Sequence, residues 1–277
     1  MTESDLVVAT NVAELKELAP TGTLLAGGTD LLVQIRAGRR VPRLIDVSSL
    51  ADAPPVVSQR DGSIELSALA PISRVIGALE GRLPGLAASA RLFGSIQIRN
   101  RATIGGNLQN ASPAADMVPP LIAAAAIARV EGPDGDRDVP VAELTTGPGR
   151  TVLREGEWIA TVTVPLPPGE EGFRKLGGRE AMAISIVNLA WRWTRATDGT
   201  LTGVRLAVGA AAPTVIRAER AENELEGRRP TPEVVSVAAA ALRSAISPID
   251  DVRGTAWYRR EVAGRLLEEV LRRGGRG

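Results

Sequence analysis

Two pairs of adjacent glycines, 78 residues apart, constrain this chain of 277 residues more than any other sequence feature. In each case the two glycines are followed by one or two polar residues and then by a leucine. Glycine allows a backbone turn with positive φ, and it lets a ligand approach the main chain without meeting a Cβ atom. The pairs therefore predict two turns that could hold an extended ligand from two sides. They lie in Leu24-Leu25-Ala26-Gly27-Gly28-Thr29-Asp30-Leu31 and in Ala102-Thr103-Ile104-Gly105-Gly106-Asn107-Leu108.

The first pair falls between a predicted strand and a predicted helix. The strand covers residues 23–26, and Thr29 or Asp30 caps a helix that ends at Gly38. The first N–H groups of a helix have no partners within it, and the helix dipole makes that end positive. The turn is therefore suited to an anion such as a phosphate group.

Neither pair matches the GxGxxG fingerprint of dinucleotide-binding proteins or the P-loop motif. On the pattern alone, a plain turn is the alternative to a ligand site. Other candidates have equally simple alternatives: Asp116 as a helix cap, Lys175 as a solvated strand charge, and Phe93 as a core residue. Trp191 and Trp193 alternate along a strand, which favours packing over a binding role.

The chain contains no cysteine and no histidine. This excludes disulfides, thiolate metal sites, iron–sulfur clusters held by this chain, histidine metal sites and a Ser–His–Asp triad. Any redox chemistry must therefore be carried by a bound organic cofactor.

The charge balance and the ends of the chain favour no unusual partner. The net charge is +1, from 33 basic and 32 acidic side chains, which gives no support to nucleic-acid binding. Residues 1–5 lack the apolar core of a signal peptide, and the apolar run 121–128 is too short to span a membrane. We expect a cytoplasmic protein.

Three segments are expected: residues 1–60 and 61–167 as small α/β units, and 172–277 as an α+β domain of antiparallel strands followed by helices. Residues 165–172 contain five breakers (proline or glycine) and two acids, which predicts a linker. Asn11 and Glu14 form a capping-box pattern at the first helix, and Asp198-Gly199 predicts a hairpin turn. The further predicted helices cover 71–79, 84–93, 116–126, 214–226, 232–246 and 255–272; the further strands cover 43–47, 63–68, 127–130, 139–144, 158–164, 187–193 (half-buried) and 204–208.

Longer motifs extend the two glycine-pair segments. Residues 98–108 continue into Ala111-Ser112-Pro113-Ala114-Ala115-Asp116. The last third contains Phe173-Arg174-Lys175 with Arg179, then Ile186-Val187-Asn188-Leu189-Ala190, and later the run 247–260. Together these motifs resemble, in order and over essentially the whole chain, the FAD-binding medium subunit of molybdenum hydroxylases, a family that includes carbon monoxide and xanthine dehydrogenases. The second block is the more specific of the two.

The resemblance implies a fold and a set of FAD contacts. The fold would be that of vanillyl-alcohol-oxidase-type flavoproteins, in which two α/β subdomains hold FAD between them. Residues 24–31 would line the pyrophosphate from one subdomain, and residues 102–107 would do so from the other, with backbone N–H groups and the Thr103 hydroxyl as donors. The remaining implied contacts are Asp116 to ribityl or ribose hydroxyls, Ile159 at the adenine end, Lys175 at the flavin and Phe93 near the cofactor.

The resemblance also implies an electron-transfer role without catalytic residues or metal ligands on this chain. A large subunit would hold the molybdenum cofactor, and a small subunit would pass electrons from two [2Fe–2S] clusters to FAD. The flavin would reduce NAD⁺, a quinone or another external acceptor, and the assembly would be a dimer of heterotrimers. Because cysteine and histidine are absent, FAD would be bound non-covalently. Two alternatives are a stand-alone flavin oxidoreductase of this fold and a cofactor-free scaffold protein.

Overall fold

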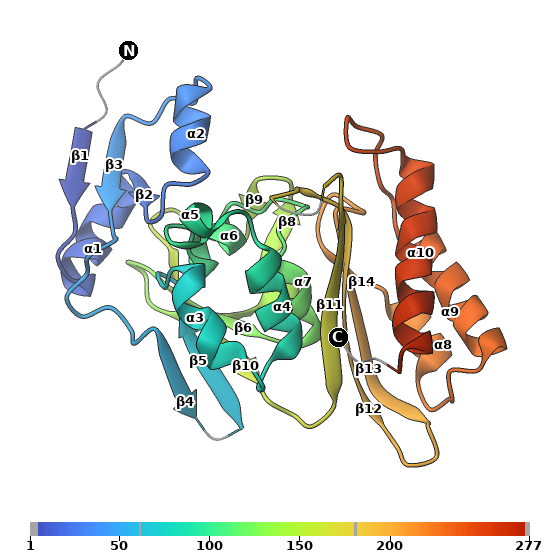
Figure 1. Ribbon diagram of the computed structural model, residues 1–277. Coiled ribbons are helices and arrows are strands. Elements are labelled where there is room, and N and C mark those ends of the chain that lie inside the picture. Colours follow the sequence, from blue (N-terminus) through green and yellow to red (C-terminus); the bar gives the residue numbers. More distant parts are fainter. Residues whose placement is uncertain (1–4, 61, 180–181, 275–277) are drawn as a thin grey trace.

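The computed structural model describes residues 5–60, 62–179 and 182–274. The described residues form four β-sheets, of which one is a separate two-stranded pair of β8 and β9. The three larger sheets follow one another across the molecule in chain order, and helices cover the outer side of the last one (Figure 1). The mixed α and β architecture confirms the predicted fold class.

The N-terminal unit has a parallel three-stranded sheet in the order β1-β3-β2. Its first helix begins as predicted, since the Asn11 side chain accepts a hydrogen bond from the Glu14 N–H at 2.9 Å. The Glu14 carboxylate reaches back to the N–H of Thr10, one residue before the cap. The elements are β1 (Asp5–Val8), α1 (Val12–Leu18), η1 (Ala19–Thr21), β2 (Thr23–Leu25), α2 (Leu31–Arg36) and β3 (Arg43–Asp46).

The middle unit has a five-stranded sheet in which every pairing is antiparallel, in the order β4-β5-β10-β6-β7. Its helices pack on this sheet around an apolar core built largely from Ala, Val, Leu and Ile. The strands are β4 (Val57–Arg60), β5 (Ser63–Ser67), β6 (Ile127–Glu131), β7 (Arg137–Pro140), β8 (Thr145–Gly147), β9 (Arg150–Thr151) and β10 (Trp158–Pro165). The helices are α3 (Ile72–Leu79), α4 (Pro84–Leu92), α5 (Ile96–Arg99), α6 (Ile104–Gln109), α7 (Val118–Ala123) and η2 (Val141–Glu143).

The C-terminal unit has an antiparallel sheet in the order β11-β12-β13-β14, followed by three helices. The predicted turn between β12 and β13 is present, with Gly199 at φ +89° and the Asp198 carboxylate accepting the Thr200 N–H. The elements are β11 (Glu170–Gly177), β12 (Ser185–Arg195), β13 (Leu201–Gly209), β14 (Ile216–Arg217), α8 (Glu219–Leu225), α9 (Pro232–Ala245) and α10 (Ala256–Arg272).

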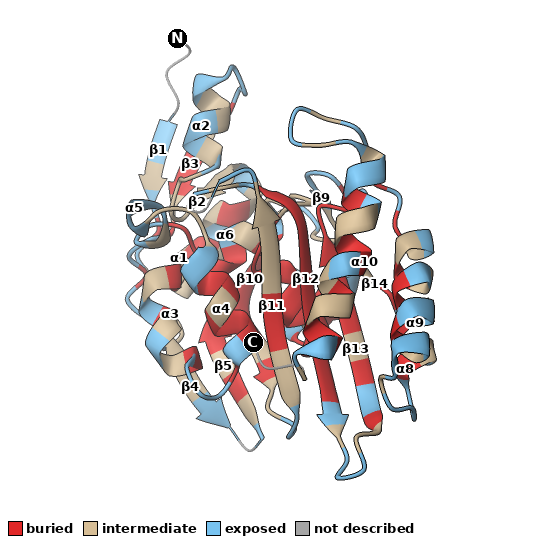
Figure 2. Ribbon diagram, turned by 45° about the vertical axis from the view of Figure 1, so that its right-hand side comes forward, coloured by how far each residue is buried: buried red, intermediate tan, exposed pale blue. Residues whose placement is uncertain are grey.

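Strand β12 is buried on both faces, so the prediction of a half-buried strand is wrong (Figure 2). One face carries Trp191 and Trp193 into the core beneath α8, α9 and α10. The other face carries Ala190 into the core of the middle unit, where α4 and α7 pack against the sheet. The C-terminal sheet is thus the layer between two sets of helices.

Several predicted boundaries were also wrong. The predicted helix 116–126 is only α7, because the Asp116 carboxylate bonds to the C-terminal sheet and does not cap a helix. Residues 216–217 pair with β13 as a strand, so the predicted helix 214–226 shortens to α8. Strand β11 begins at Glu170, inside the predicted linker, and residues 141–143 form a 3₁₀ turn in place of strand. The polar strand β4 was missed.

Candidate functional site

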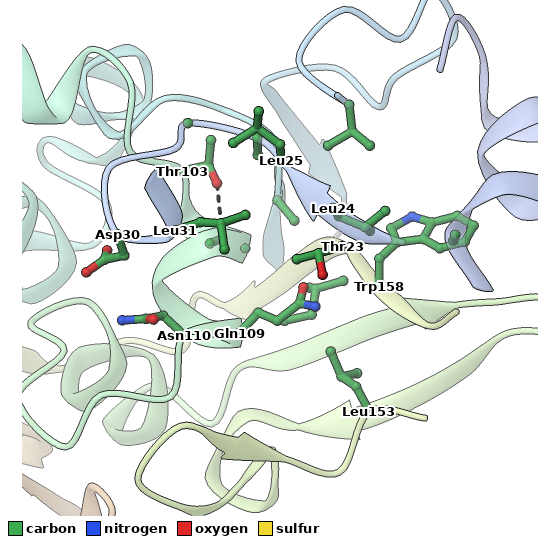
Figure 3. Close-up of a pocket in the computed structure, with 18 of the residues that line it drawn as sticks. Thr23, Leu24, Leu25, Asp30, Leu31, Thr103, Gln109, Asn110, Leu153 and Trp158 are labelled. Atoms are coloured by element: carbon green, nitrogen blue, oxygen red, sulfur yellow. Dashed lines mark hydrogen bonds between the residues drawn. The ribbon is translucent and has the colours of Figure 1, made fainter. Parts of the chain in front are cut away.

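A cavity of about 720 Å³ lies between the N-terminal unit and the middle unit, within the usual size of small-molecule sites. The end of β2, the start of α2, helix α6 and residues 149–159 line it (Figure 3). Asp30 and Asn110 lie toward one end, and Leu153 and Trp158 toward the other.

Fifteen of the eighteen predicted site residues line this cavity. They include all of 24–31, together with Phe93 and Ile159. Of the segment 102–107, only Ile104 is directed away, because it is fully buried in the core of the middle unit. Asp116 and Lys175 also do not line the cavity.

The first glycine pair forms a turn, as predicted. Gly28 has φ +71°, a conformation that residues with a Cβ rarely adopt. Gly27 lies against the opposite wall: an added Cβ would be 1.9 Å from the carbonyl oxygen of Arg101. The two glycine-containing segments therefore touch each other, and glycine at position 27 is required for that approach.

Backbone donors are available on this first wall. Within the described residues, the N–H groups of Gly27, Gly28, Thr29 and Asp30 donate no hydrogen bond to any protein group. Four consecutive free N–H groups at a turn before a helix suit an anion. The Asp30 carboxyl lies nearby, and partial burial raises its pKa.

The second glycine pair does not form a turn of positive φ; it is the first turn of α6. The N–H of Gly105 donates to the Ala68 carbonyl at 2.8 Å, and that of Gly106 donates to the Thr103 hydroxyl at 3.0 Å. The N–H of Asn107 donates to the Thr103 carbonyl. The prediction that backbone N–H groups serve a ligand is therefore not supported for Gly105, Gly106 and Asn107, whose N–H groups bond within the protein. The Thr103 hydroxyl is a side-chain donor on this wall.

The two glycines of α6 have different surroundings. An added Cβ on Gly105 would be 2.8 Å from the Cβ of Ala68, so this glycine is a packing requirement. An added Cβ on Gly106 would meet only the Thr103 hydroxyl, at 3.0 Å, and otherwise open space. Since Gly106 is exposed and lines the cavity, its missing side chain leaves room for a ligand.

Asn107 supplies a further sign that a group is to be bound here. Its side-chain oxygen is buried and has no hydrogen-bond partner among the described residues. Buried polar atoms are nearly always paired, so an unpaired oxygen on a residue that lines a cavity indicates a missing donor. The Thr103 hydroxyl accepts one bond and keeps its proton to donate. Both observations fit a ligand rich in hydroxyl and phosphate groups.

Two further features of the lining were not predicted from the sequence. The Glu157 carboxylate is held by the Arg137 guanidinium at 2.7 Å, which lowers its pKa, and it also accepts the Arg154 N–H. At the other end, Gln34 of α2 donates to the Asn110 side chain at 3.0 Å and joins the two units beside the cavity. No motif marks these positions. The other unpredicted lining residues drawn in Figure 3 are Thr23, Gln109, Leu153 and Trp158.

Asp116 and Lys175 form a buried pair next to the cavity rather than in its wall. The Lys175 ammonium lies 2.5 Å from one Asp116 oxygen, and the other oxygen accepts from Ser185 at 2.6 Å and from Asn188 at 3.0 Å. The Lys175 ammonium is also 3.4 Å from the carbonyl oxygen of Leu92, the residue before Phe93. The cluster thus joins the middle unit to the C-terminal sheet, and its Lys175 contacts the residue before Phe93, which lines the cavity.

Two absences apply to the described ranges 5–60, 62–179 and 182–274. There, no group of three or more acidic side chains is arranged to hold a metal ion. No helix is long and apolar enough to cross a membrane.

Comparisons with known proteins agree with this geometry. A family model described as the FAD binding domain in molybdopterin dehydrogenase matches residues 4–167, and one described as the CO dehydrogenase flavoprotein C-terminal domain matches residues 172–273. The xanthine dehydrogenase FAD-binding subunit of Escherichia coli O157:H7 is 30% identical over 258 residues, which are 91% of this chain and 88% of that protein. The carbon monoxide dehydrogenase medium chain of Hydrogenophaga pseudoflava is 30% identical over 269 residues, 94% and 91% of the two chains.

A solved structure extends the similarity to three dimensions. Carbon monoxide dehydrogenase from Hydrogenophaga pseudoflava, in a form lacking the Mo-pyranopterin moiety of its cofactor, superimposes with a TM-score of 0.93 at 30% identity. The match covers 98% of this chain and 96% of that one. The predicted resemblance and the predicted cofactor class are therefore confirmed, and the chain belongs to the family of FAD-binding oxidoreductase subunits of the molybdenum hydroxylases.

Proposed function

We propose that this chain carries FAD in the cavity between its first two units, accepts electrons from the [2Fe–2S] clusters of a partner subunit and passes them to an external acceptor. The observation that carries the proposal is the set of four free N–H groups at Gly27–Asp30, opposite the open side of Gly106. FAD supplies the redox chemistry when bound, and this chain supplies position and electrostatics.

The cofactor would be bound without a covalent link, with its pyrophosphate at the first glycine pair. The free N–H groups there would donate to phosphate oxygens, and the Thr103 hydroxyl would donate from the facing wall. The apolar end formed by Leu24, Leu153 and Ile159 would receive the adenine ring.

The flavin would lie toward Phe93, which also lines the cavity. For Asp116 we propose a contact to ribityl or ribose hydroxyls, and for Lys175 a position beside the flavin. The 3.4 Å contact of the Lys175 ammonium with the Leu92 carbonyl supports this, because Leu92 precedes Phe93 in the chain. Both side chains would have to exchange part of their mutual bonding for the cofactor.

The remaining parts of the proposal concern organisation. We infer three structural segments, at 1–60, 61–167 and 172–277, because each of the three larger sheets is built from strands of one segment. The partners would be a large subunit with the molybdenum cofactor and a small [2Fe–2S] subunit, in a dimer of heterotrimers. Relatives named as medium chains support this arrangement.

One experiment tests the function directly. The purified chain is reconstituted with FAD, and its visible spectrum and flavin content are measured. The chain is then mixed with its dithionite-reduced [2Fe–2S] subunit, and bleaching of the flavin absorbance is followed. We expect about one FAD per chain and rapid flavin reduction. Absence of bound flavin would refute the proposal, and turnover of a small substrate by the isolated chain would favour a stand-alone oxidoreductase.

A further inference from the structure

A largely buried ion pair belongs to the wall of the cavity at the end where Leu153 and Trp158 lie (Figure 3). Glu157 lines the cavity, and its side chain is only 6% exposed. The Arg137 guanidinium, on β7, binds this carboxylate through two hydrogen bonds, from Nε at 2.9 Å and from Nη2 at 2.7 Å. A two-point pair of this kind fixes the orientation of both side chains as well as stabilising them.

The pair holds both ends of one short connection. Residues 152–157 join β9 to β10 and belong to neither strand. At the start of the connection, Nη2 of Arg137 also donates to the Val152 carbonyl at 2.9 Å. At its end, the Glu157 carboxylate accepts the Arg154 N–H at 2.7 Å, and the Glu157 N–H donates to the Arg154 carbonyl at 3.1 Å. One guanidinium and one carboxylate thus close the connection into a fixed turn.

The turn also touches the N-terminal unit. Gly156 has φ +75°, and an added Cβ there would be 2.8 Å from the Cγ of Pro20, which lines the cavity too. The same Cβ would be 3.2 Å from Pro133, between β6 and β7. The turn is therefore packed between two units, and any shift of it would change the shape of this end of the site.

The turn has groups that could recognise a base. Glu157 is not the donor, because its oxygens bind Arg137 and Arg154. Within the part of the chain that the structure describes, the N–H groups of Glu155 and Gly156 donate to no protein group, and both residues line the cavity. Adenine has ring nitrogens that accept hydrogen bonds, so two free donors on an otherwise apolar end suit this base.

Arg137 has a second task, which is to balance charge. FAD carries a pyrophosphate, and an unpaired carboxylate in the same wall would repel it. Hydrogen bonds from the Arg137 guanidinium lower the pKa of Glu157, so this side chain stays ionised and remains a strong acceptor. The neighbouring guanidinium offsets its negative charge beside the ligand.

We propose that the Arg137–Glu157 pair positions residues 153–156 for the adenosine end of the cofactor, and thereby makes the chain selective for FAD over FMN, which lacks that end. Both are positioning residues, because they act through the turn. This rests on the proposed function, in which FAD fills the cavity with its adenine at this end. The pair strengthens binding only of ligands that reach the turn, whereas a merely structural pair would not distinguish among ligands.

The test titrates the full chain separately with FAD, FMN and ADP. Glu157→Gln keeps the size of the side chain but removes its charge, and Arg137→Lys keeps the charge but not the two-point bonding. The matched control is Glu222→Gln in the C-terminal unit. Glu222 is also 6% exposed, pairs with the 28% exposed Arg217 and accepts one backbone N–H, that of Leu206 at 2.8 Å. Fluorescence gives the Kd for the two flavins, calorimetry gives that for ADP, and Tm without ligand is recorded for each protein.

We expect both test variants to bind FAD and ADP at least about tenfold more weakly and FMN within about twofold of the wild type. Glu222→Gln should lower Tm but leave all three affinities unchanged. If Glu157→Gln does not fold, Arg137→Lys decides the comparison.

Three results would overturn the inference while leaving the proposed function intact. They are equal weakening of FAD and FMN in the test variants, unchanged FAD affinity in those variants, and failure of ADP to compete with FAD for the wild type. Absence of FAD binding by the wild type would instead refute the proposed function itself.

Discussion

Gly27 lies directly against the backbone of Arg101, and an added Cβ at position 27 would be 1.9 Å from the Arg101 carbonyl oxygen. The two glycine-bearing walls of the cavity are therefore in contact at their base. Farther along each wall, Gly28 and Gly106 both line the cavity, and an added Cβ on Gly106 would meet only the Thr103 hydroxyl. This contact sets how far apart the two halves of the site lie.

Gly27→Ala should disturb both the fold and the site. No side-chain rearrangement can relieve a contact between a Cβ and a backbone carbonyl, so the N-terminal unit must shift away from the middle unit. We expect a loss of about 1–3 kcal/mol in the free energy of unfolding, as for other overpacked positions. Urea unfolding measures the stability, and fluorescence titration measures the FAD affinity, which should fall.

Gly77→Ala is the matched control for that variant. Gly77 lies in α3, and an added Cβ would meet nothing within 4 Å. Because Ala is favoured over Gly in a helix interior by up to about 1 kcal/mol, this variant should be neutral or slightly stabilised. Equal stability of the two variants would show that the Gly27 contact is not tight.

Gly106→Val should block the ligand without unfolding the protein. The position is open except for the Thr103 hydroxyl at 3.0 Å, so the new methyl groups would occupy the cavity. We expect FAD occupancy after reconstitution to be lost, while Tm without FAD stays within a few degrees of that of the wild type. Gly106→Ala should give an intermediate affinity. Full flavin occupancy in the valine variant would show that this glycine does not face the cofactor.

The sequence singled out residues that gather around one cavity, but it did not predict the task of each glycine. The local rules worked: Asn11, Thr231 and Thr255 cap helices as their side chains suggest. The role of Gly27 depends on its contact with Arg101, 74 residues later in the chain. The role of Gly105 depends on its contact with Ala68, which directly follows strand β5. The family resemblance rested more on the second glycine segment, whereas the free N–H groups lie in the first.

The buried side chains of the C-terminal sheet show the same limit. From the sequence, Lys175 could equally be a solvated charge on a strand. In the structure its side chain is only 6% exposed and is paired with Asp116. Its partner, Asp116, lies 59 residues earlier, and Ser185 and Asn188 complete the cluster from the next strand. Strand β12 has the alternation of a half-buried strand, but α7 packs against it, and α4 packs against the neighbouring strand β11. The second face of β12 is buried because the middle unit packs against the C-terminal sheet. No local sequence pattern encodes a contact between segments so far apart in the chain.

Lys175→Met should destabilise the docking of the middle unit on the C-terminal sheet. The Asp116 carboxylate, 8% exposed, would lose its ionic partner and keep only Ser185 and Asn188. Removal of one member of a buried pair costs about 3–5 kcal/mol, so unfolding in urea should shift to lower concentration even without FAD.

The double variant Asp116→Asn/Lys175→Met controls for the unpaired charge. It removes both charges, so its loss in free energy of unfolding should be smaller than the sum of the losses measured for the two single variants. Additive losses would show that the two side chains do not interact in solution. A parallel FAD titration separates a cofactor role from this structural one.

Asp251→Asn should have a pH-dependent effect on stability. Hydrogen bonds from the Arg253 guanidinium, with the charge of the buried Arg259, hold the pKa of the Asp251 carboxyl well below its usual range. A depressed folded-state pKa means that the ionised carboxylate stabilises the fold fully above its unfolded-state pKa near 4, and that this stabilisation is lost as the pH falls through the folded value.

The variant should therefore be about 1.5–3 kcal/mol less stable than the wild type at pH 7, since a charge-assisted hydrogen bond to a buried guanidinium is weakened. Denaturant unfolding from pH 7 to pH 2.5 should show this difference narrowing only below about pH 4. A constant difference over the whole range would contradict the assignment.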